Sequence, residues 1–449
     1  MGYIPNTQDD QQKMLQKIGV RSFDELIANI PQELQFQGEL DLPAPLSEFE
    51  VHQHLSELAS KNKHGDDLVC FLGGGAYDHF IPAVIKHLTS RSEFYTAYTP
   101  YQPEVSQGTL QTIYEFQTMI CELTGMDVAN ASVYDGGSAL AEAMLLAVGY
   151  TKRKTILVSG SVNPNYLEII KTYSVGREIE IRTVDWSDGI TDLTKLKSEL
   201  NDTVAAVIVQ HPNFFGYLED VHHISELVHQ AGALLITSND PISLAILEPP
   251  AVYGADIATG EGQALGNAIS FGGPYLGLFA TKKELVRLMP GRIVGRTVDK
   301  NNKSGFVLTL QTREQHIRRE KATSNICTNQ GLNALTATIY MALMGKNGLP
   351  HIAELCVQKS HYLYEKLLAI PQVEPVFDGP FFKEFVIKIN AAKPLSFYLD
   401  ALISKGFLAG MDLKTFDDRL ENILLVAVTE KRTRKELDTF CSALQELLA

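Results

Sequence analysis

The sequence lacks several features that would assign a protein to a class at once. From Ser198 through Thr281 it contains no lysine and no arginine. Its five cysteines are scattered without a CxxC pair, so they fit neither a disulfide framework nor a zinc site. Twelve histidines show no HExxH spacing, and the adjacent His222 and His223 point to different faces of any helix. We therefore expect no catalytic metal.

Long apolar runs are also missing. No stretch reaches the roughly 18 uninterrupted apolar residues of a membrane span, and the start has no basic region followed by an apolar run. We expect a cytoplasmic protein that makes no contact with a membrane. A net charge of -14 argues against general affinity for nucleic acid, because a polyanion needs a basic surface.

What is present indicates a soluble globular protein of two or three domains. The chain has 449 residues, of which 45% are hydrophobic and 20% charged. Residues 1–62 read as short helices joined by polar and proline-containing linkers, and they form either an arm that wraps a partner or a packing extension. We expect a large α/β domain over 63–330 and a smaller α+β domain over 331–449.

Apolar runs and amphipathic segments alternate from about residue 68 to residue 290, as in βαβ units. Short, nearly continuous apolar runs such as AAVIVQHP and ALLITSND indicate strands that are covered on both faces. The fold class is therefore α/β, with a mostly parallel sheet between helices. Ligands are expected at the carboxyl ends of its strands.

Polar residues collect at that expected edge. His211 and Asn213 follow one strand, and Asp240 follows the next. In a pyridoxal phosphate enzyme a histidine can stack on the cofactor and an acid can pair with the pyridinium nitrogen. An equally good interpretation is structural, because Asp240 precedes a proline in a turn and His211 can simply close a strand.

Two glycine clusters precede apolar segments. Gly136, Gly137 and Ser138 stand where a loop becomes a helix, so their backbone amides could hold a phosphate or carboxylate, although packing would also explain them. Gly73–Gly75 has neither the P-loop residues nor a dinucleotide fingerprint. We interpret it as a close backbone approach, and neither NAD nor ATP is supported.

The stretch without lysine lies where a pyridoxal enzyme of this architecture would carry its Schiff-base lysine. An aldehyde cofactor is held covalently only by an amine. We therefore expect that no amine of this chain captures such a cofactor.

Two other segments are candidates for an interface that borders an active site. Prolines rule out a long helix between residues 95 and 106, so the tyrosines there lie on a shaped loop, for binding or for packing. A basic block runs from Met289 to Lys321 in an otherwise acidic chain. The loop residues singled out are Tyr95, Tyr98, Tyr101, Glu104 and Ser106.

Several of these segments resemble one family. The runs TPYQPEVSQG, QHPNFFGYLED, VYGADIATGEGQALGNAISFGGPYLG, MPGRIVG and above all QTREQHIRREKATSNICT are similar to the P protein of the glycine cleavage system, glycine dehydrogenase (decarboxylating). The resemblance covers essentially the whole chain. Its length suits the two-chain version of that enzyme, and it resembles the α chain.

The resemblance implies the fold-type I architecture of pyridoxal phosphate enzymes, like that of aspartate aminotransferase. It also implies a homologous β subunit that holds pyridoxal phosphate on its lysine, in an α2β2 assembly. In this chain the lysine's place falls near Gln263 or Ala264. With β, the α chain would decarboxylate glycine and pass the aminomethyl group to the lipoyl arm of the H protein.

Active sites of such enzymes lie at subunit interfaces, which implies a role for the basic block. It could donate to the β-bound phosphate or to the carboxylate of glycine, or it could hold the subunits together by ion pairs. An alternative function for the whole chain is a silent scaffold or regulatory subunit that only stabilises its partner. The block residues singled out are Arg313, Arg318, Arg319, Lys321, Thr323, Ser324 and Asn325.

Overall fold

The computed structural model describes residues 5–36, 38, 40–63, 65 and 67–449. Residues 1–4, 37 and 39 of the expected arm, and residues 64 and 66 of the expected large domain, lie outside the described residues. The chain forms two compact units, Met1–Lys63 and His64–Ala449. The proposed division at residue 330 falls inside the second unit and stays a prediction.

The first unit is helical, as expected. Thr7 and Ser47 each form a capping box, which explains why helices start directly after them. None of its helical residues is buried. Its elements are α1 (Gln8–Ile18), α2 (Phe23–Leu26), the 3-10 turn η1 (Gln32–Leu34) and α3 (Glu48–Ala59).

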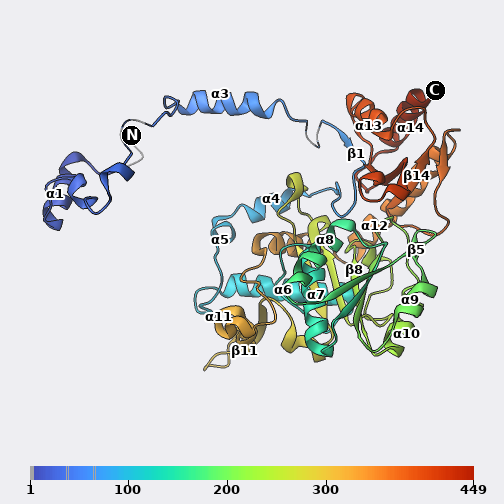
Figure 1. Ribbon diagram of the computed structural model, residues 1–449, viewed down its shortest axis with the longest axis horizontal. Helices are drawn as coiled ribbons and strands as arrows, with labels where there is room; N and C mark the ends of the chain where they lie inside the picture. The colour runs from blue at the N-terminus through green and yellow to red at the C-terminus, as the bar shows by residue number, and fades with distance from the viewer. Residues whose placement is uncertain (1–4, 37, 39, 64, 66) are drawn as a thin grey trace. The chain divides into compact units, whose positions relative to one another are not determined.

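A seven-stranded sheet organises the second unit (Figure 1). Its order is β2-β10-β9-β8-β7-β3-β4, and the five strands from β9 to β4 run parallel, which confirms the expected mostly parallel sheet. β10 pairs antiparallel with both neighbours. The strands are β2 (Val128–Ala129), β3 (Thr155–Ser159), β4 (Glu180–Val184), β7 (Val204–His211), β8 (Leu234–Asn239), β9 (Ile257–Glu261) and β10 (Gly277–Thr281).

Strand β7 shows why the runs are apolar. Val207 and Val209 pack into one core, whereas Ala206 and Ile208 pack into another on the opposite face. The first core contains apolar residues of α10 and α12, and the second contains those of α7. Helices therefore cover both faces, as the uninterrupted hydrophobicity predicted.

The helices around this sheet follow ordinary capping rules. Asp135 caps α7 through the Ser138 N–H, Asp220 caps α10 through the His223 N–H, and Gly125 ends α6 in a left-handed conformation. The helices are α4 (Ala83–Thr89), α5 (Ser92–Tyr95), α6 (Gln107–Thr124), α7 (Gly136–Thr151), α8 (Pro164–Val175), α9 (Leu193–Glu199), α10 (Val221–Gln230), α11 (Gln315–Arg318) and α12 (Gly331–Leu368).

A second sheet of four strands lies in the carboxyl-terminal part, in the order β13-β14-β17-β16, and all of its pairings are antiparallel. The long helix α12, interrupted at Gly345, packs on the large core as far as Cys356, and its last turns, with Leu363 and Leu367, pack on the core of this sheet. The elements are β13 (Val373–Pro375), β14 (Glu384–Ile389), β16 (Met411–Asp412), β17 (Ile423–Ala427), α13 (Leu395–Ser404) and α14 (Arg434–Leu448).

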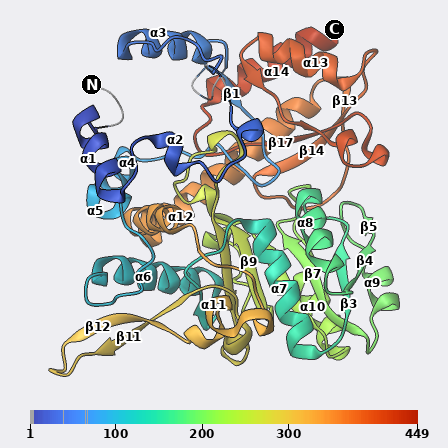
Figure 2. The same cartoon turned by 60° about the vertical axis from the view of Figure 1, so that its left-hand side comes forward.

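Smaller pairings complete the unit. Figure 2 shows the β11–β12 hairpin extending from the body beside α11. Among the described residues, no helix has both the length and the apolar character that crossing a bilayer requires. The remaining strands are β11 (Ile293–Val298) with β12 (Ser304–Thr309), β1 (Val69–Cys70) with β15 (Phe407–Leu408), and β5 (Trp186–Ser187) with β6 (Ile190–Thr191).

Candidate functional site

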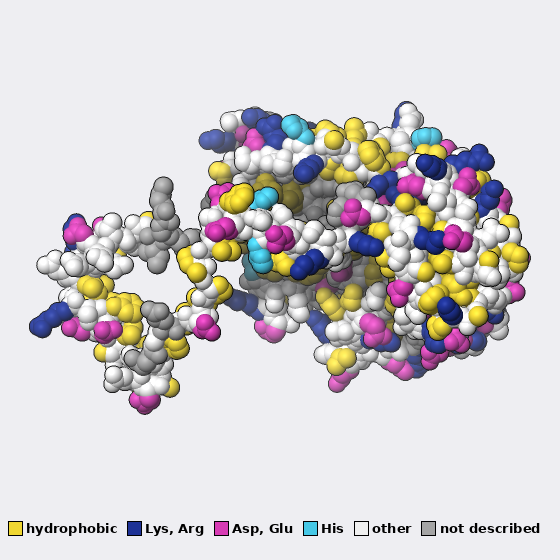
Figure 3. Space-filling view, turned by 90° about the horizontal axis from the view of Figure 1, so that it is seen from above, with side chains coloured by type: hydrophobic (Ala, Val, Ile, Leu, Met, Phe, Trp, Pro, Cys, Tyr) yellow, Lys and Arg dark blue, Asp and Glu magenta, His cyan; other side chains and the backbone are white. Residues whose placement is uncertain are grey.

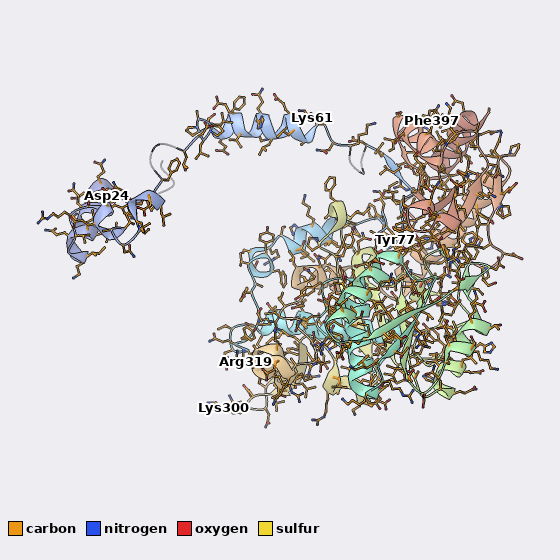
Figure 4. The ribbon with its side chains drawn as sticks, viewed as in Figure 1. Asp24, Lys61, Tyr77, Lys300, Arg319 and Phe397 are labelled. Carbon is orange, nitrogen blue, oxygen red and sulfur yellow. The ribbon has the colours of Figure 1, made fainter. Side chains whose placement is uncertain are left out.

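A small cavity of about 30 Å³ lies where the carboxyl ends of β7, β8 and β9 face the start of β14. This is the edge at which the sequence predicted a ligand. Figure 4 shows Tyr77 here, where the large sheet meets the carboxyl-terminal part. The lining residues are Gly75, Tyr77, Tyr166, Gln210, Pro212, Gly216, Ser238, Asn239, Asp240, Glu261, Phe382, Lys383 and Glu384.

A lysine from outside the stretch between Ser198 and Thr281 lines this cavity. Lys383, only 1% exposed, directly precedes β14 and places Nζ 2.5 Å from Asp240 Oδ2. The ammonium also lies 3.0 Å from His79 Nε2 and 3.5 Å from the centre of the Tyr77 ring. Lys383 lies outside the lysine-free stretch and reaches the cavity from the residue before β14, so that stretch alone did not reveal it. That no amine of this chain captures an aldehyde cofactor stays a prediction.

Behind Lys383 the polar contacts continue to the other end of the chain. His79 Nδ1 lies 2.6 Å from Glu430 Oε2, and the Phe80 N–H donates to Glu430 Oε1. Burial raises the pKa of Glu430, but these hydrogen bonds outweigh it and hold the pKa at about 2. These contacts form one continuous chain of polar side chains. Lys383 lies between Asp240 and His79, and His79 in turn lies between Lys383 and Glu430.

Part of this row has the composition of a metal site. His79, Cys356 and Glu430 could present ligand atoms to one ion. However, Lys383 places a positive charge against the other nitrogen of His79. Burial also raises the pKa of the Cys356 thiol well above its ordinary value, so the thiolate that a metal prefers is disfavoured. The geometry suits a hydrogen-bonded network better than a cation.

The anion-binding end of α7 is already used by this chain. The Gly136 N–H donates to Glu261 Oε2 at 2.9 Å, while the Gln263 and Leu276 N–H groups donate to Glu261 Oε1 at 3.0 Å. Burial raises the pKa of Glu261 to about 8, against the lowering effect of these three donors. The predicted cradle exists, and a carboxyl group of the protein fills it.

The place expected for a Schiff-base lysine holds a fully engaged glutamine. Gln263 follows β9 and is 2% exposed. Its Oε1 accepts from the Tyr77 N–H at 2.8 Å, and its Nε2 donates to the carbonyls of Tyr77 and Asn267. The side chain therefore ties the segment around Tyr77 to the end of β9.

The glycine cluster at 73–75 is a close backbone approach, as the sequence indicated. A Cβ at Gly73 would lie 2.1 Å from Glu384 Oε1. Glu384 Oε1 accepts from the Gly74 N–H and Oε2 from the Tyr77 hydroxyl, both at 2.7 Å. Burial raises the pKa of Glu384 to about 7.

Other candidates of the predicted pocket are engaged in local structure. His211 Nδ1 accepts from the Glu219 N–H, and burial lowers the pKa of this histidine to about 4. Asn213 Oδ1 accepts from two backbone N–H groups of the turn that follows it. A Cβ at Gly137 would meet Ile169 at 2.4 Å, and the Ser138 N–H completes the cap of α7. Of the candidates, Asp240 lines the cavity and Gly136 anchors Glu261.

The structure brings the tyrosine loop and the basic block together through Arg292. The Arg292 guanidinium lies 5.4 Å from the centre of the Tyr101 ring and donates to the Tyr101 hydroxyl. It also donates to Asn329 and to the carbonyl of Cys327. Tyr95 and Tyr98 line a neighbouring cavity of about 190 Å³ with residues 328–335. The two segments thus form one surface.

Members of the basic block differ in what they touch. Arg313 is used internally, since it donates to the carbonyls of Met289 and Gly291. Arg318, Arg319 and Lys321 are exposed and make no ion pair within the described residues. Figure 4 shows Arg319 well away from Tyr77, so the block does not reach this chain's own cavity.

The remaining candidates are spread over the same region. Arg319 and Asn325 line a cavity of about 480 Å³, and Thr323 and Ser324 line a cleft of about 10 Å³. Burial raises the pKa of Glu142 to about 7, and a hydrogen bond with Ser324 offsets part of that rise. Glu104 and Ser106 lie on the loop before α6, where Ser106 accepts the first backbone hydrogen bond of that helix.

Sequence reasoning missed Tyr77, Tyr166, Glu261, Lys383 and Glu384. Glu261 lies in a glycine-rich segment directly after an apolar strand, and Lys383 and Glu384 are adjacent charges at the start of another apolar strand. Charges at such positions are a usable signal for a buried site. Their pairing with one another could not be read from spacing, because the elements are far apart in the chain.

Comparisons with known proteins agree over the whole chain. The family model described as glycine cleavage system P-protein matches residues 1–444. Two relatives are named probable glycine dehydrogenase (decarboxylating) subunit 1. The one from Carboxydothermus hydrogenoformans is 55% identical and covers 99% of both chains, and the one from Chloroherpeton thalassium is 56% identical and covers 100% of both.

Solved structures show the same fold. A crystal structure of glycine decarboxylase (P-protein) of the glycine cleavage system, in inhibitor-bound form, matches with a TM-score of 0.92 at 44% identity over 100% of both chains. A glutamate decarboxylase from Lactobacillus brevis matches at a TM-score of 0.70 and 12% identity, over 94% of this chain and 96% of that one, which shows the fold alone. The fold class is therefore that of fold-type I pyridoxal phosphate enzymes, as the resemblance implied.

Proposed function

Because this chain belongs to the glycine cleavage system P-protein family, we propose that it is the α subunit of a two-chain glycine dehydrogenase (decarboxylating). With a partner chain it decarboxylates glycine and passes the aminomethyl group to the lipoyl arm of the H protein. The observation that carries this proposal is the match of the whole chain to relatives named as subunit 1. An assembly of the α2β2 type follows from the same proposal.

The cofactor of this enzyme belongs, in our proposal, to the partner chain. Bound pyridoxal phosphate supplies an electron sink for the carbanion that decarboxylation leaves. Support comes from Gln263, which lies at or beside the place that the resemblance implies for the lysine and has its amide fully engaged. The cavity of about 30 Å³ is also far too small for a cofactor and holds about one water molecule.

The surface formed by residues 95–106 and 313–325 is our candidate for the contact with the partner's site. Arg292 joins the two segments, while Arg318, Arg319 and Lys321 leave their charges exposed. Exposed guanidinium groups on a shaped surface can bind a phosphate or a carboxylate with two parallel hydrogen bonds. This chain would therefore orient an anionic group that the partner holds.

The rival hypothesis is a silent scaffold, and a variant of the free arginines tests the difference. We expect Arg318→Ala/Arg319→Ala to assemble with the partner but to lose about tenfold or more in glycine–carbon dioxide exchange, because a charge-assisted hydrogen bond contributes on the order of 1.5–3 kcal/mol. Exchange is measured on the mixed chains, and assembly by size-exclusion chromatography with light scattering.

Lys388→Ala is the matched control, since Lys388 is an exposed cation on β14 in the carboxyl-terminal sheet. It should leave both readouts unchanged. Full exchange activity in the assembled arginine variant would favour the scaffold. Exchange activity of the chain without any partner would contradict the two-chain assignment itself.

A further inference from the structure

The fold family implies a pyridoxal phosphate pocket in every chain, and the residues of this chain do not fit that cofactor. An acid for the pyridine nitrogen is present, namely Asp240, and a helix start for the phosphate is present at Gly136. Both are engaged by other side chains of the same protein, and the space left between them is about 30 Å³.

Lys383 contributes the positive charge that Asp240 would otherwise receive from a protonated pyridine ring. Its three contacts, to Asp240, to the Nε2 of His79 and to the face of Tyr77, satisfy the ammonium completely. At 1% exposure it is shielded from bulk solvent. Without Lys383 the carboxylate of Asp240 would be buried without a charged partner, which would strongly destabilise the folded chain.

Glu261 supplies the acceptor that the amino end of α7 would otherwise find in a phosphate. Its two oxygens accept from three backbone N–H groups, at 2.9, 3.0 and 3.0 Å. Two of these donors, on Gly136 and Gln263, belong to the helix start and to the turn that carries a lysine in a cofactor-binding chain. A Cβ at Gly136 would lie 3.1 Å from the Cβ of Glu261, so glycine is needed for this close approach.

We propose that Lys383 and Glu261 are built-in replacements for the two polar ends of the missing cofactor. They satisfy Asp240 and the start of α7, close the pocket against aldehyde cofactors, and join the two sheets, because Lys383 directly precedes β14 whereas Asp240 follows β8. This inference does not depend on the proposed function, since its tests use the full-length chain without partner, glycine or H protein.

A double-mutant cycle tests the Lys383–Asp240 pair. We expect Lys383→Met to lower the Tm of the full-length chain by about 5 °C or more, because it leaves a buried acid unpaired. The double variant Asp240→Asn/Lys383→Met should recover most of that loss, since no uncompensated charge remains. A single variant without loss, or a double variant no better than the single one, would overturn the pairing.

Chemical labelling tests closure of the pocket. The full-length chain is incubated with pyridoxal 5′-phosphate, reduced with borohydride and mapped by peptide mass spectrometry. Lys383 should stay unlabelled, while exposed Lys388 gives the reference level for an accessible amine. Labelling of Lys383 at that level would mean that its amine captures the cofactor, and the proposal would fail.

Removal of the Glu261 side chain tests the other end. We expect Glu261→Ala to gain a rise in Tm of a few degrees with millimolar inorganic phosphate over chloride at equal ionic strength, because the freed amides bind the anion. The wild-type chain and exposed Glu178→Ala should show no such gain. If the alanine variant does not fold, Glu261→Ser is used instead. A folded variant without a phosphate response would refute the role given to Glu261.

Discussion

At the scale of single residues, the centre of this protein is unusual for its buried acids. Glu384 is buried and Glu261 is half-buried, and burial raises their pKa values to about 7 and about 8. Glu430, in the same region, has a pKa of about 2 because hydrogen bonds outweigh its burial. These carboxyl groups therefore contribute to stability with opposite pH dependence, because burial prevails at Glu261 and Glu384 whereas the contacts with His79 and the backbone prevail at Glu430.

Glu384 should make the chain less stable as pH rises. Its folded pKa of about 7 exceeds the unfolded value of 4.5, so the folded state holds an extra proton between these values and its stability falls across that window. In Glu384→Gln the amide oxygen can still accept from the Gly74 N–H and the amide NH2 can donate to the Tyr77 hydroxyl, without the charge. We expect the free energy of unfolding of this variant to exceed that of wild type by roughly 3 kcal/mol at pH 8 and by much less at pH 5.

Urea unfolding of the full-length chain at several pH values measures this difference. Glu178→Gln is the control, because hydrogen bonding and charge from Lys154 lower the pKa of exposed Glu178, so its difference from wild type should stay flat above pH 5. A pH-independent difference for Glu384→Gln would show that Glu384 is not the titrating group.

At the scale of elements, a close contact between β10 and the start of α7 holds one side of the central cavity in place. A Cβ at Gly277 would lie 2.4 Å from the backbone oxygen of Asp135, the residue that caps α7. The strand thus touches the turn that presents the Gly136 N–H to Glu261. The position of the helix relative to the sheet is set by backbone contact, not by side-chain packing alone.

Two glycines associated with α7 should therefore respond oppositely to alanine. Gly277→Ala should lower the free energy of unfolding by about 1–3 kcal/mol, because the added methyl group overpacks a rigid backbone contact. Gly149→Ala, within α7 itself, should add about 0.5–1 kcal/mol, because its methyl group meets nothing within 4 Å and alanine favours a helix. Denaturant unfolding of the two variants, analysed for midpoint and slope, measures both changes in the free energy of unfolding. Equal effects would mean that β10 can move away from Asp135.

At the scale of the whole molecule, the described residues of the amino-terminal unit form no buried core of their own. None of its helical residues is buried, and apolar side chains stand at its surface (Figure 3). Phe49 in α3 is 77% exposed, and Phe36 is 69% exposed. Helices this short are marginal in water without tertiary packing. These apolar groups are consistent with the expectation of an arm that wraps a partner, which stays a prediction.

A charge-neutral change in the arm should weaken assembly alone. We expect Phe36→Ser/Phe49→Ser to leave the Tm of the isolated full-length chain within about 2 °C of wild type, because neither ring is buried. The affinity of this variant for the partner chain should fall at least about tenfold, because both rings would become buried in the complex and their contacts would be lost. Phe397→Ser, also at an exposed phenylalanine, is the control in the other unit. Unchanged affinity in titration calorimetry would mean that the arm does not bind the partner.

The sequence by itself determined the architecture and the family. Continuous apolar runs place β7, β8 and β9 in a covered parallel sheet, because a strand buried on both faces has no polar alternation to show. Capping residues such as Asp220 mark a helix start from local hydrogen bonding alone. The family resemblance placed the missing Schiff-base lysine near Gln263 or Ala264, which stays a prediction.

Only the tertiary structure decided what fills the pocket. Asp240 was recognised as an acid at a strand end, but its partner Lys383 directly precedes a strand of a different sheet, and no local pattern couples residues so distant in the chain. Gly136 was predicted as part of a possible anion cradle, whereas the group that accepts its N–H is the carboxyl of Glu261 in this same chain. Local propensity and hydrophobic period are properties of neighbours in sequence. Charge pairing in a core depends on which surfaces the folded chain brings together, and packing alone settles that.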